Sequence, residues 1–137
     1  MERQTDSVEE TLQIGREMGA TLAPNSIICL FGELGAGKTS FVKGIAEGAA
    51  GISSDSVQSP TFTYLNIYPG KLPIYHFDLY RIKGVEDFLG MGFDEYLEAG
   101  GVCCIEWSER IQEILPEACT KITLSHLSNG GRRILWT

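Results

Sequence analysis

The sequence has no long apolar run and few basic residues, which disfavours a membrane-spanning protein and an independent nucleic-acid-binding protein. No segment approaches the roughly 18 consecutive apolar residues of a membrane-spanning helix. The first residues also lack the apolar core of a secretory signal, so we expect a cytoplasmic protein without a membrane partner. A net charge of −7 disfavours an independent grip on nucleic acid, because phosphate contacts need clustered Lys and Arg.

The cysteines and histidines show no metal-binding spacing. Cys29, Cys103 and Cys104 fall in apolar runs, Cys119 stands alone, and no Cys-x-x-Cys pair occurs. With only two histidines to help, a structural metal is disfavoured, and we expect structural thiols. A chain of 137 residues with 43% hydrophobic residues can bury an ordinary core without such support. We therefore expect one domain over 1–137.

Apolar periodicity predicts alternating strands and helices. Helices are expected over residues 7–22, 39–50 and 108–115, with one or two short helices over 85–99. A wholly apolar strand, suited to a mainly parallel sheet covered on both faces, is expected at 27–31. Another apolar strand, with an acid at its end, is expected at 102–107. Two hairpins are expected, 62–68 with 73–80 and 122–127 with 132–136. Ser7 and Ser108 are the expected helix caps, and the Ser-rich stretch 53–60 is expected to be a mobile loop.

A phosphate-binding motif lies between the first apolar strand and the helix that follows it. Residues 32–39 read Gly-Glu-Leu-Gly-Ala-Gly-Lys-Thr, the Walker A pattern, whose glycines let backbone N–H groups curl around phosphates. Lys38 is expected to reach the β- and γ-phosphates, and the Thr39 hydroxyl to bind Mg²⁺. The residues expected to bind ATP here are Glu33, Leu34, Gly35, Ala36, Gly37, Lys38, Thr39 and Ser40.

Two acids stand at the ends of later strands, where a P-loop enzyme places the carboxylate that orients Mg²⁺. Glu106 closes the most strand-like run after the P-loop and best fits that role, while Asp78 has a similar setting. Either could be an ordinary acid at a strand end. His76 more often packs than catalyses in such a position. Arg81 could pair with Asp78 or contact phosphate, and the sequence leaves both open.

These features predict an α/β P-loop NTPase-like three-layer fold with a mainly parallel central sheet and antiparallel additions. ATP is favoured over GTP because the Asn-Lys-x-Asp element that reads guanine is absent from the sequence. A small-molecule P-loop kinase is one alternative, although no arginine cluster lies between residues 84 and 101, where a lid could fit. A nucleotide-dependent interaction switch is another.

Four motifs occur in one order along nearly the whole chain. They are the P-loop, Ser-Pro-Thr-Phe at 59–62, His-Phe-Asp-Leu-Tyr-Arg at 76–81, and Glu-Trp at 106–107. Together they resemble the TsaE (YjeE) family, bacterial ATPases of threonylcarbamoyladenosine (t6A) biosynthesis on tRNA. The resemblance implies an ATPase that is weak alone and works with TsaB and TsaD on the modification at tRNA position 37. The acidic charge of the chain agrees with this role if a partner holds the tRNA, so we expect its contact with tRNA to be indirect.

The resemblance also implies roles for individual residues. Lys38, Asp78, Glu106 and Thr61 are the catalytic candidates, with Thr61 near the γ-phosphate in a switch-like loop. Thr39, Glu106 and Asp78 are the expected Mg²⁺ ligands. Trp107 is expected beside the nucleotide. The adenine is expected near four further residues, namely Ser7, Val8, Gly131 and Arg132.

Overall fold

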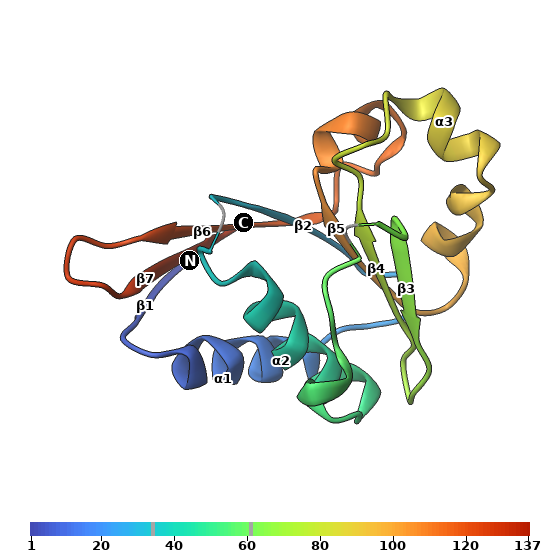
Figure 1. Cartoon of the computed structure of the whole chain (residues 1–137). Coiled ribbons are helices and arrows are strands. Elements are labelled where there is room, and N and C mark those ends of the chain that lie inside the picture. The colour runs from blue at the N-terminus through green and yellow to red at the C-terminus, as the bar shows by residue number, and fades with distance from the viewer. Residues whose placement is uncertain (34, 61) are drawn as a thin grey trace.

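One mixed β-sheet runs through the molecule in the computed structural model, which describes residues 1–33, 35–60 and 62–137 (Figure 1). Within these residues the strand order is β1-β7-β6-β2-β5-β4-β3. The strands are β1 (Glu2–Thr5), β2 (Ile27–Gly32), β3 (Leu65–Tyr68), β4 (Ile74–Asp78), β5 (Val102–Glu106), β6 (Thr120–His126) and β7 (Arg132–Trp136). Strands β6, β2, β5 and β4 pair in parallel, and antiparallel pairs add β7 with β1 at one edge and β3 at the other. The predicted sheet, including both hairpins, is confirmed.

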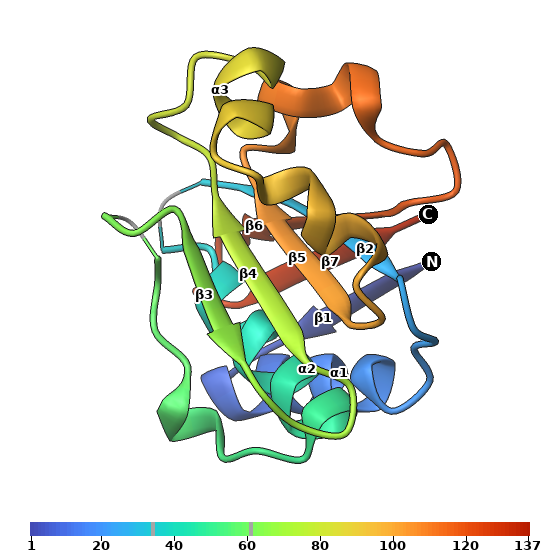
Figure 2. The ribbon, with the colours of Figure 1, turned by 90° about the vertical axis from the view of Figure 1, so that its right-hand side faces the viewer.

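Helices cover the sheet from two sides. The long helices α1 (Val8–Gly19) and α2 (Lys38–Ala50) lie together on one face (Figure 1). The short helices α3 (Val85–Gly90), η2 (Phe93–Glu98) and η3 (Ser108–Ile114) cover β4 and β5 on the other face (Figure 2). One apolar core lies on each side of the sheet. Among the helices of the described residues, none is both long and apolar enough to cross a membrane.

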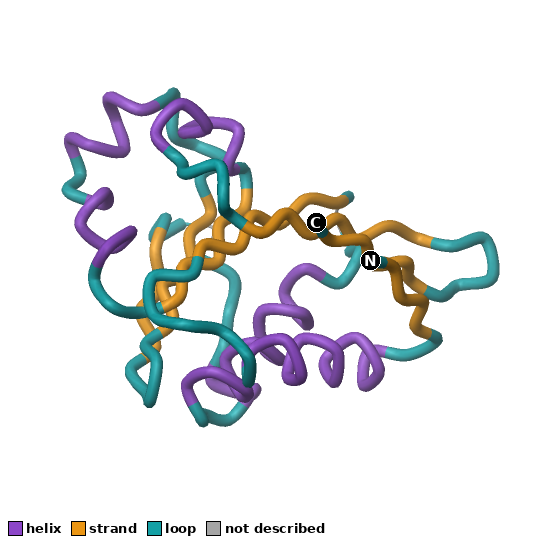
Figure 3. Tube along the Cα trace, turned by 180° about the vertical axis from the view of Figure 1, so that it is seen from behind, coloured by secondary structure: helices purple, strands orange, loops and turns teal. Residues whose placement is uncertain are grey.

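Burial along the strands follows their place in the sheet. Strands β2 and β5 are buried almost throughout, as expected for central parallel strands with packed layers on both faces. Strand β6 alternates instead, with Ile122 and Leu124 buried in the core beneath α1 and α2. The N- and C-terminal strands end side by side (Figure 3), where the Met1 amino group donates to the Trp136 carbonyl at 2.9 Å.

Three expectations about element ends need correction. The predicted first helix is capped by Ser7 as expected, but it ends at Gly19 rather than residue 22, and strand β1 precedes it. Strand β1 was missed because its residues are polar, and it is held by pairing with β7 near the other end of the chain. Ser108 does not cap the helix that follows β5. Trp107 occupies that position with a positive φ of 62°, and Ser108 lies buried inside the 3₁₀ turn.

The Ser-rich stretch after α2 is more structured than its composition suggests. It contains the 3₁₀ turn η1 (Ser54–Ser56), and Val57 is 1% exposed in the core. Gln58 is bound at both backbone groups by the Tyr68 hydroxyl, which accepts from its N–H at 2.9 Å and donates to its carbonyl at 3.2 Å. The expectation of a mobile loop over 53–60 missed these anchors, because the burial of Val57 depends on the surrounding core and the Tyr68 hydroxyl comes from β3.

Helices α1 and α2 approach so closely that glycine is required between them. A Cβ built on Gly44 would lie 2.2 Å from the Leu12 carbonyl oxygen and 2.8 Å from the Arg16 nitrogen. We expect Gly44→Ala to lower the free energy of unfolding by about 1–3 kcal/mol, the usual cost of overpacking a closely packed site. Gly90→Ala is the matched control, since its added Cβ meets nothing within 4 Å. Urea unfolding followed by circular dichroism measures both, and equal stability of the two variants would contradict this account.

Candidate active site

The P-loop turns from β2 into α2 through backbone conformations that favour glycine. Gly32 has φ 148°, and a Cβ there would lie 2.4 Å from the Leu124 carbonyl oxygen. Gly37 has φ 103° and is the N-cap of α2. These two glycines bring the first turn of α2, with its free N–H groups and positive dipole end, to the carboxyl end of the parallel strands. This arrangement is suited to binding phosphate.

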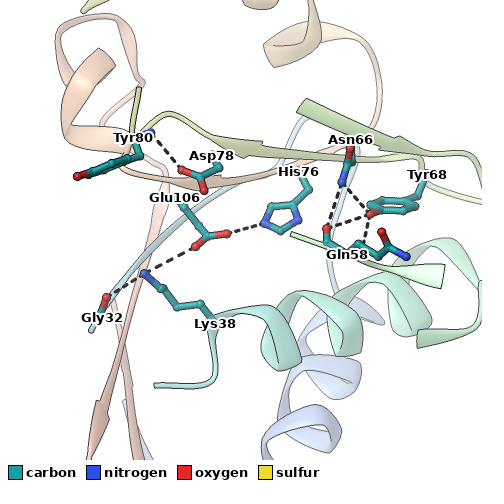
Figure 4. Close-up of polar contacts among 9 residues, drawn as sticks. All are labelled: Gly32, Lys38, Gln58, Asn66, Tyr68, His76, Asp78, Tyr80 and Glu106. Atoms are coloured by element: carbon teal, nitrogen blue, oxygen red, sulfur yellow. Dashed lines mark hydrogen bonds and ion pairs between the residues drawn. The ribbon is translucent and has the colours of Figure 1, made fainter. Parts of the chain in front are cut away.

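Lys38 points back across the loop rather than out to solvent. Its Nζ donates to the Gly32 carbonyl at 2.9 Å and lies 3.7 Å from Glu106 Oε1 (Figure 4). The side chain is 17% exposed. The ammonium group is therefore held at the mouth of the loop, where its charge can meet an anion.

The two predicted acids are neighbours because β4 and β5 run parallel. The register pairs Asp78 with Glu106 across these strands, and Figure 4 shows the two carboxyl groups close together above Lys38. Parallel strands end at the same edge of a sheet, so one acid from each meets the P-loop there. The structure thus brings together both acids that the sequence left as alternatives.

Two side chains contact the carboxylate of Glu106. His76 Nε2 lies 2.8 Å from Oε2, and Lys38 faces the other carboxylate oxygen. Burial raises the pKa of Glu106, but the hydrogen bonds and charges of His76 and Lys38 outweigh it, so the pKa lies below its ordinary 4.5. Glu106 is therefore kept as a carboxylate at neutral pH, as a metal ligand must be.

Asp78 is in the opposite electrostatic situation. Burial raises its pKa above the ordinary 3.8, the amide of Tyr80 lowers it by donating to Oδ1 at 3.1 Å, and the nearby charge of Glu106 raises it again. An ionised Asp78 is thus less favourable in the folded chain than in the unfolded one, so the free protein carries a carboxylate that a cation would stabilise.

Replacing Asp78 with asparagine should therefore raise the melting temperature of the nucleotide-free protein at pH 7. Asparagine can still accept from the Tyr80 amide, while the destabilising charge is removed. The difference from wild type should shrink as pH falls through the raised pKa of folded Asp78 and vanish below 3.8, where both folded and unfolded states carry a protonated Asp78. Thermal unfolding at several pH values measures this, with the exposed Asp94→Asn as control. A lower melting temperature at pH 7 would contradict the assigned environment.

A cavity of about 820 Å³ lies over the P-loop and the two strand ends. It gathers most of the predicted nucleotide and metal residues, and adds Ser59 and Tyr80. Its lining comprises Gly32, Glu33, Gly35, Gly37, Lys38, Thr39, Ser40, Ser59, Asp78, Tyr80, Glu106 and Trp107. Among the other predicted residues, Ala36 has its side chain fully buried in the core, so only its backbone can serve a ligand. Leu34 and Thr61 lie outside the described residues.

A second cavity, of about 260 Å³, also borders the P-loop. Its lining includes all four residues predicted near the adenine together with Gly35, Gly37 and Ser40, which line the larger cavity too. Sequence analysis missed its remaining lining residues, Asp6, Thr11 and Gly130. Arg132 ties the terminal hairpin to the P-loop by donating to the Gly35 carbonyl at 3.2 Å. Segments from both ends of the chain therefore meet the P-loop here.

Trp107 lies in the larger cavity rather than in this second one. Its ring contacts Tyr80 at a centroid distance of 4.9 Å, and the Arg110 guanidinium lies 5.2 Å from its centroid on a neighbouring turn. The contact of Tyr80 with Trp107, in which the rings are tilted by 56°, was missed by sequence analysis. The guanidinium of Arg81 lies over the Phe62 ring, 4.7 Å from the centroid.

The oxygen donors around the larger cavity suit Mg²⁺ held together with phosphates. Thr39, Asp78 and Glu106 all line it, and Mg²⁺ is usually bound by one or two carboxylates together with substrate phosphates and retained waters. In the part of the chain that the structure describes, no cluster of three or more His, Cys, Asp or Glu side chains could hold a metal by itself. The glycine-lined loop and this donor set fit a magnesium–nucleotide complex.

Comparisons with known proteins agree with the motifs of the sequence. A family model described as "Threonylcarbamoyl adenosine biosynthesis protein TsaE" matches residues 5–134. A Treponema pallidum (strain Nichols) protein described as "tRNA threonylcarbamoyladenosine biosynthesis protein TsaE" is 44% identical over 128 residues, covering 93% of each chain. A Bacillus subtilis (strain 168) protein of the same description is 42% identical over 134 residues, covering 97% of this chain and 82% of its own.

The fold agrees as well. The structure described as "Crystal structure of Bacillus subtilus YdiB" matches with a TM-score of 0.80 and 35% identity, covering 99% of this chain and 83% of that chain. Sequence, family model and fold coincide over almost the full length, which confirms the resemblance drawn from the motifs. The chain belongs to the TsaE family.

Proposed function

We propose that this protein binds and hydrolyses ATP with Mg²⁺ and that it serves the t6A modification of tRNA. The single observation that carries the proposal is the contact of Lys38 with Glu106 across the P-loop, at 3.7 Å. This contact joins an ammonium group and a carboxylate beside the first turn of α2, and we assign the first to phosphate and the second to the metal. Both groups are required by phosphoryl transfer, in which catalysis is mainly positioning and charge stabilisation.

Each group of residues in the site has a proposed role in binding or hydrolysis. The P-loop amides and Lys38 bind the triphosphate, while Thr39 and Glu106, with Asp78, hold the metal. When bound, Mg²⁺ neutralises charge that develops on the phosphoryl oxygens. Asp78 is the second acid at this edge and is the group proposed to orient the attacking water. Thr61 keeps its proposed role near the γ-phosphate.

The second cavity supports adenosine as the nucleoside. It borders the P-loop at Gly35, Gly37 and Ser40, so a nucleotide whose phosphates occupy the loop can reach it. Ser7, Val8, Gly131 and Arg132 are the proposed contacts of the base. Val8 is 64% exposed, which leaves an apolar surface available for the flat ring.

Membership of the TsaE family supports the proposed place in t6A formation at tRNA position 37. TsaB and TsaD are the proposed protein partners, and the chain is proposed to hydrolyse ATP weakly without them. A net charge of −7 favours indirect contact with tRNA, because a partner would have to supply the positive surface that holds it.

Reconstitution tests this function directly. Phosphate release from ATP and GTP is measured for the purified chain, with and without Mg²⁺, across a titration of TsaB and TsaD. Formation of t6A on an unmodified tRNA is measured in parallel, with ATP or a nonhydrolysable analogue. We expect Mg²⁺-dependent turnover of ATP that rises with the partners, and t6A only with hydrolysable ATP. Activity with the analogue would favour a binding switch, and transfer of phosphate to a small acceptor would favour a kinase.

A further inference from the structure

His76 is a buried polar side chain beside the site that the proposed function leaves without a role. It is fully buried, and Nε2 lies 2.8 Å from Glu106 Oε2. Alternation along β4 puts His76 on the same face as Asp78, while Phe77 points into the core on the opposite side. In the register with β5, His76 lies opposite Cys104, two residues before Glu106. The imidazole therefore reaches Glu106 diagonally across the pair of strands β4 and β5.

The contact divides the two oxygens of Glu106 between different partners. Oε2 faces His76, and Oε1 faces Lys38 Nζ (Figure 4). Because His76 holds Oε2, the carboxylate cannot rotate freely, and Oε1 stays directed at the P-loop. Glu106 is 7% exposed, and little water is available to replace the imidazole as a partner.

The second ring nitrogen of His76 shows that a histidine at this position costs stability. Among the described residues, Nδ1 has no hydrogen-bond partner although it is buried. A buried polar atom left unsatisfied costs about 1–3 kcal/mol, so an apolar side chain would suit the packing alone better. Because a carboxylate oxygen can only accept, Nε2 must carry the proton that joins the two groups.

We propose that His76 is a positioning residue that orients Glu106, by an Nε2–H donation to Oε2, so that Oε1 is presented to the metal–nucleotide site. The statement that Oε1 is presented to a metal rests on the proposed function. Partners that orient a metal ligand typically change metal affinity or activity by about 10–100-fold when removed. A core residue that only packs would change stability without changing the response to Mg²⁺.

The first test uses the free protein and needs no nucleotide. ¹⁵N NMR of the imidazole nitrogens at neutral pH reports which of them carries a proton. We expect His76 to be protonated at Nε2. The second histidine, His126, is distinguished by the spectrum of His126→Gln. An unprotonated Nε2 at His76 would overturn the proposal, whatever the protein does with ATP.

The second test compares three variants of the full chain. His76→Gln keeps an amide N–H at the same number of bonds from the backbone, His76→Leu removes the donor, and Phe77→Leu damages the core from the same strand without facing Glu106. Each is titrated with Mg²⁺ in the presence of ATP, with the fluorescence of Trp107 as a binding signal, and hydrolysis is measured separately.

We expect His76→Leu to raise the Mg²⁺ midpoint by about 10–100-fold and to lower kcat, with Mg²⁺-free nucleotide affinity within a few-fold of wild type. His76→Gln should recover most of this loss, and Phe77→Leu should lower the melting temperature while leaving the midpoint unchanged. Equal midpoints for His76→Leu and wild type, or for His76→Leu and His76→Gln, would overturn the proposal. Wild-type protein that neither binds nor hydrolyses ATP would instead overturn the proposed function, and the NMR result would still decide the orientation of His76.

Discussion

Replacing Lys38 with alanine should reduce ATP hydrolysis by about 10²–10³-fold, the usual cost of removing one preorganised electrostatic donor from an active site. The ammonium group is held between the Gly32 carbonyl and Glu106, so it is already in place before a nucleotide arrives. A flexible lysine would first have to be ordered. Alanine is a better helix former than lysine, and the first turn of α2 should survive the change.

The expected result is measured as steady-state phosphate release, with circular dichroism to confirm folding. Lys43→Ala is the matched control, because Lys43 lies on the same helix and does not line the cavity. It should retain wild-type turnover. A folded Lys38→Ala protein with wild-type turnover would refute the assignment of the P-loop as the ATP phosphate site.

Glu106→Gln should produce the second large loss, seen mainly in the response to Mg²⁺. Glutamine keeps the shape and can still accept from His76, but it turns an uncharged amide towards Lys38 and the proposed metal. We expect the Mg²⁺ concentration at half-maximal hydrolysis to rise by about 10–100-fold, the range seen when the environment of a metal site is altered. Nucleotide affinity without Mg²⁺ should stay within a few-fold of wild type.

Comparison with Asp78→Asn ranks the two acids by their effect on the Mg²⁺ response. Glu109→Gln is the control, because Glu109 is an exposed acid three residues after Glu106. An unchanged Mg²⁺ response in Glu106→Gln, with a shifted response in Asp78→Asn, would transfer the main metal role to Asp78. If neither variant changed the Mg²⁺ response, the carboxyl ends of β4 and β5 would not belong to the metal site.

The stability of Glu106→Gln carries a pH signature opposite to that of Asp78→Asn. Because the folded pKa of Glu106 lies below 4.5, its carboxylate stabilises the fold above that pH, and the contribution is lost as pH falls through the folded value. Glu106→Gln should thus be less stable than wild type at pH 7 and approach it in acid. Asp78→Asn should be more stable at pH 7.

Local sequence alone determined the P-loop and its setting. The apolar run before Gly32 and the helix after Lys38 are consecutive in the chain, so their order dictates a strand, a glycine turn and a helix N-terminus. Glu106 was also predictable, since it closes a buried strand. These features depend on neighbours within a few residues, so the local sequence is sufficient to specify them.

Only the tertiary structure decided which distant residues meet. His76 and Glu106 are thirty positions apart, and their contact follows from the register of β4 on β5, which side-chain packing sets across the whole sheet. Likewise, Ser7 and Arg132 share a cavity because β1 pairs with β7 at the sheet edge. Strand pairing between remote segments is not encoded by local periodicity, so sequence could name the chemical groups of this site but not their partners.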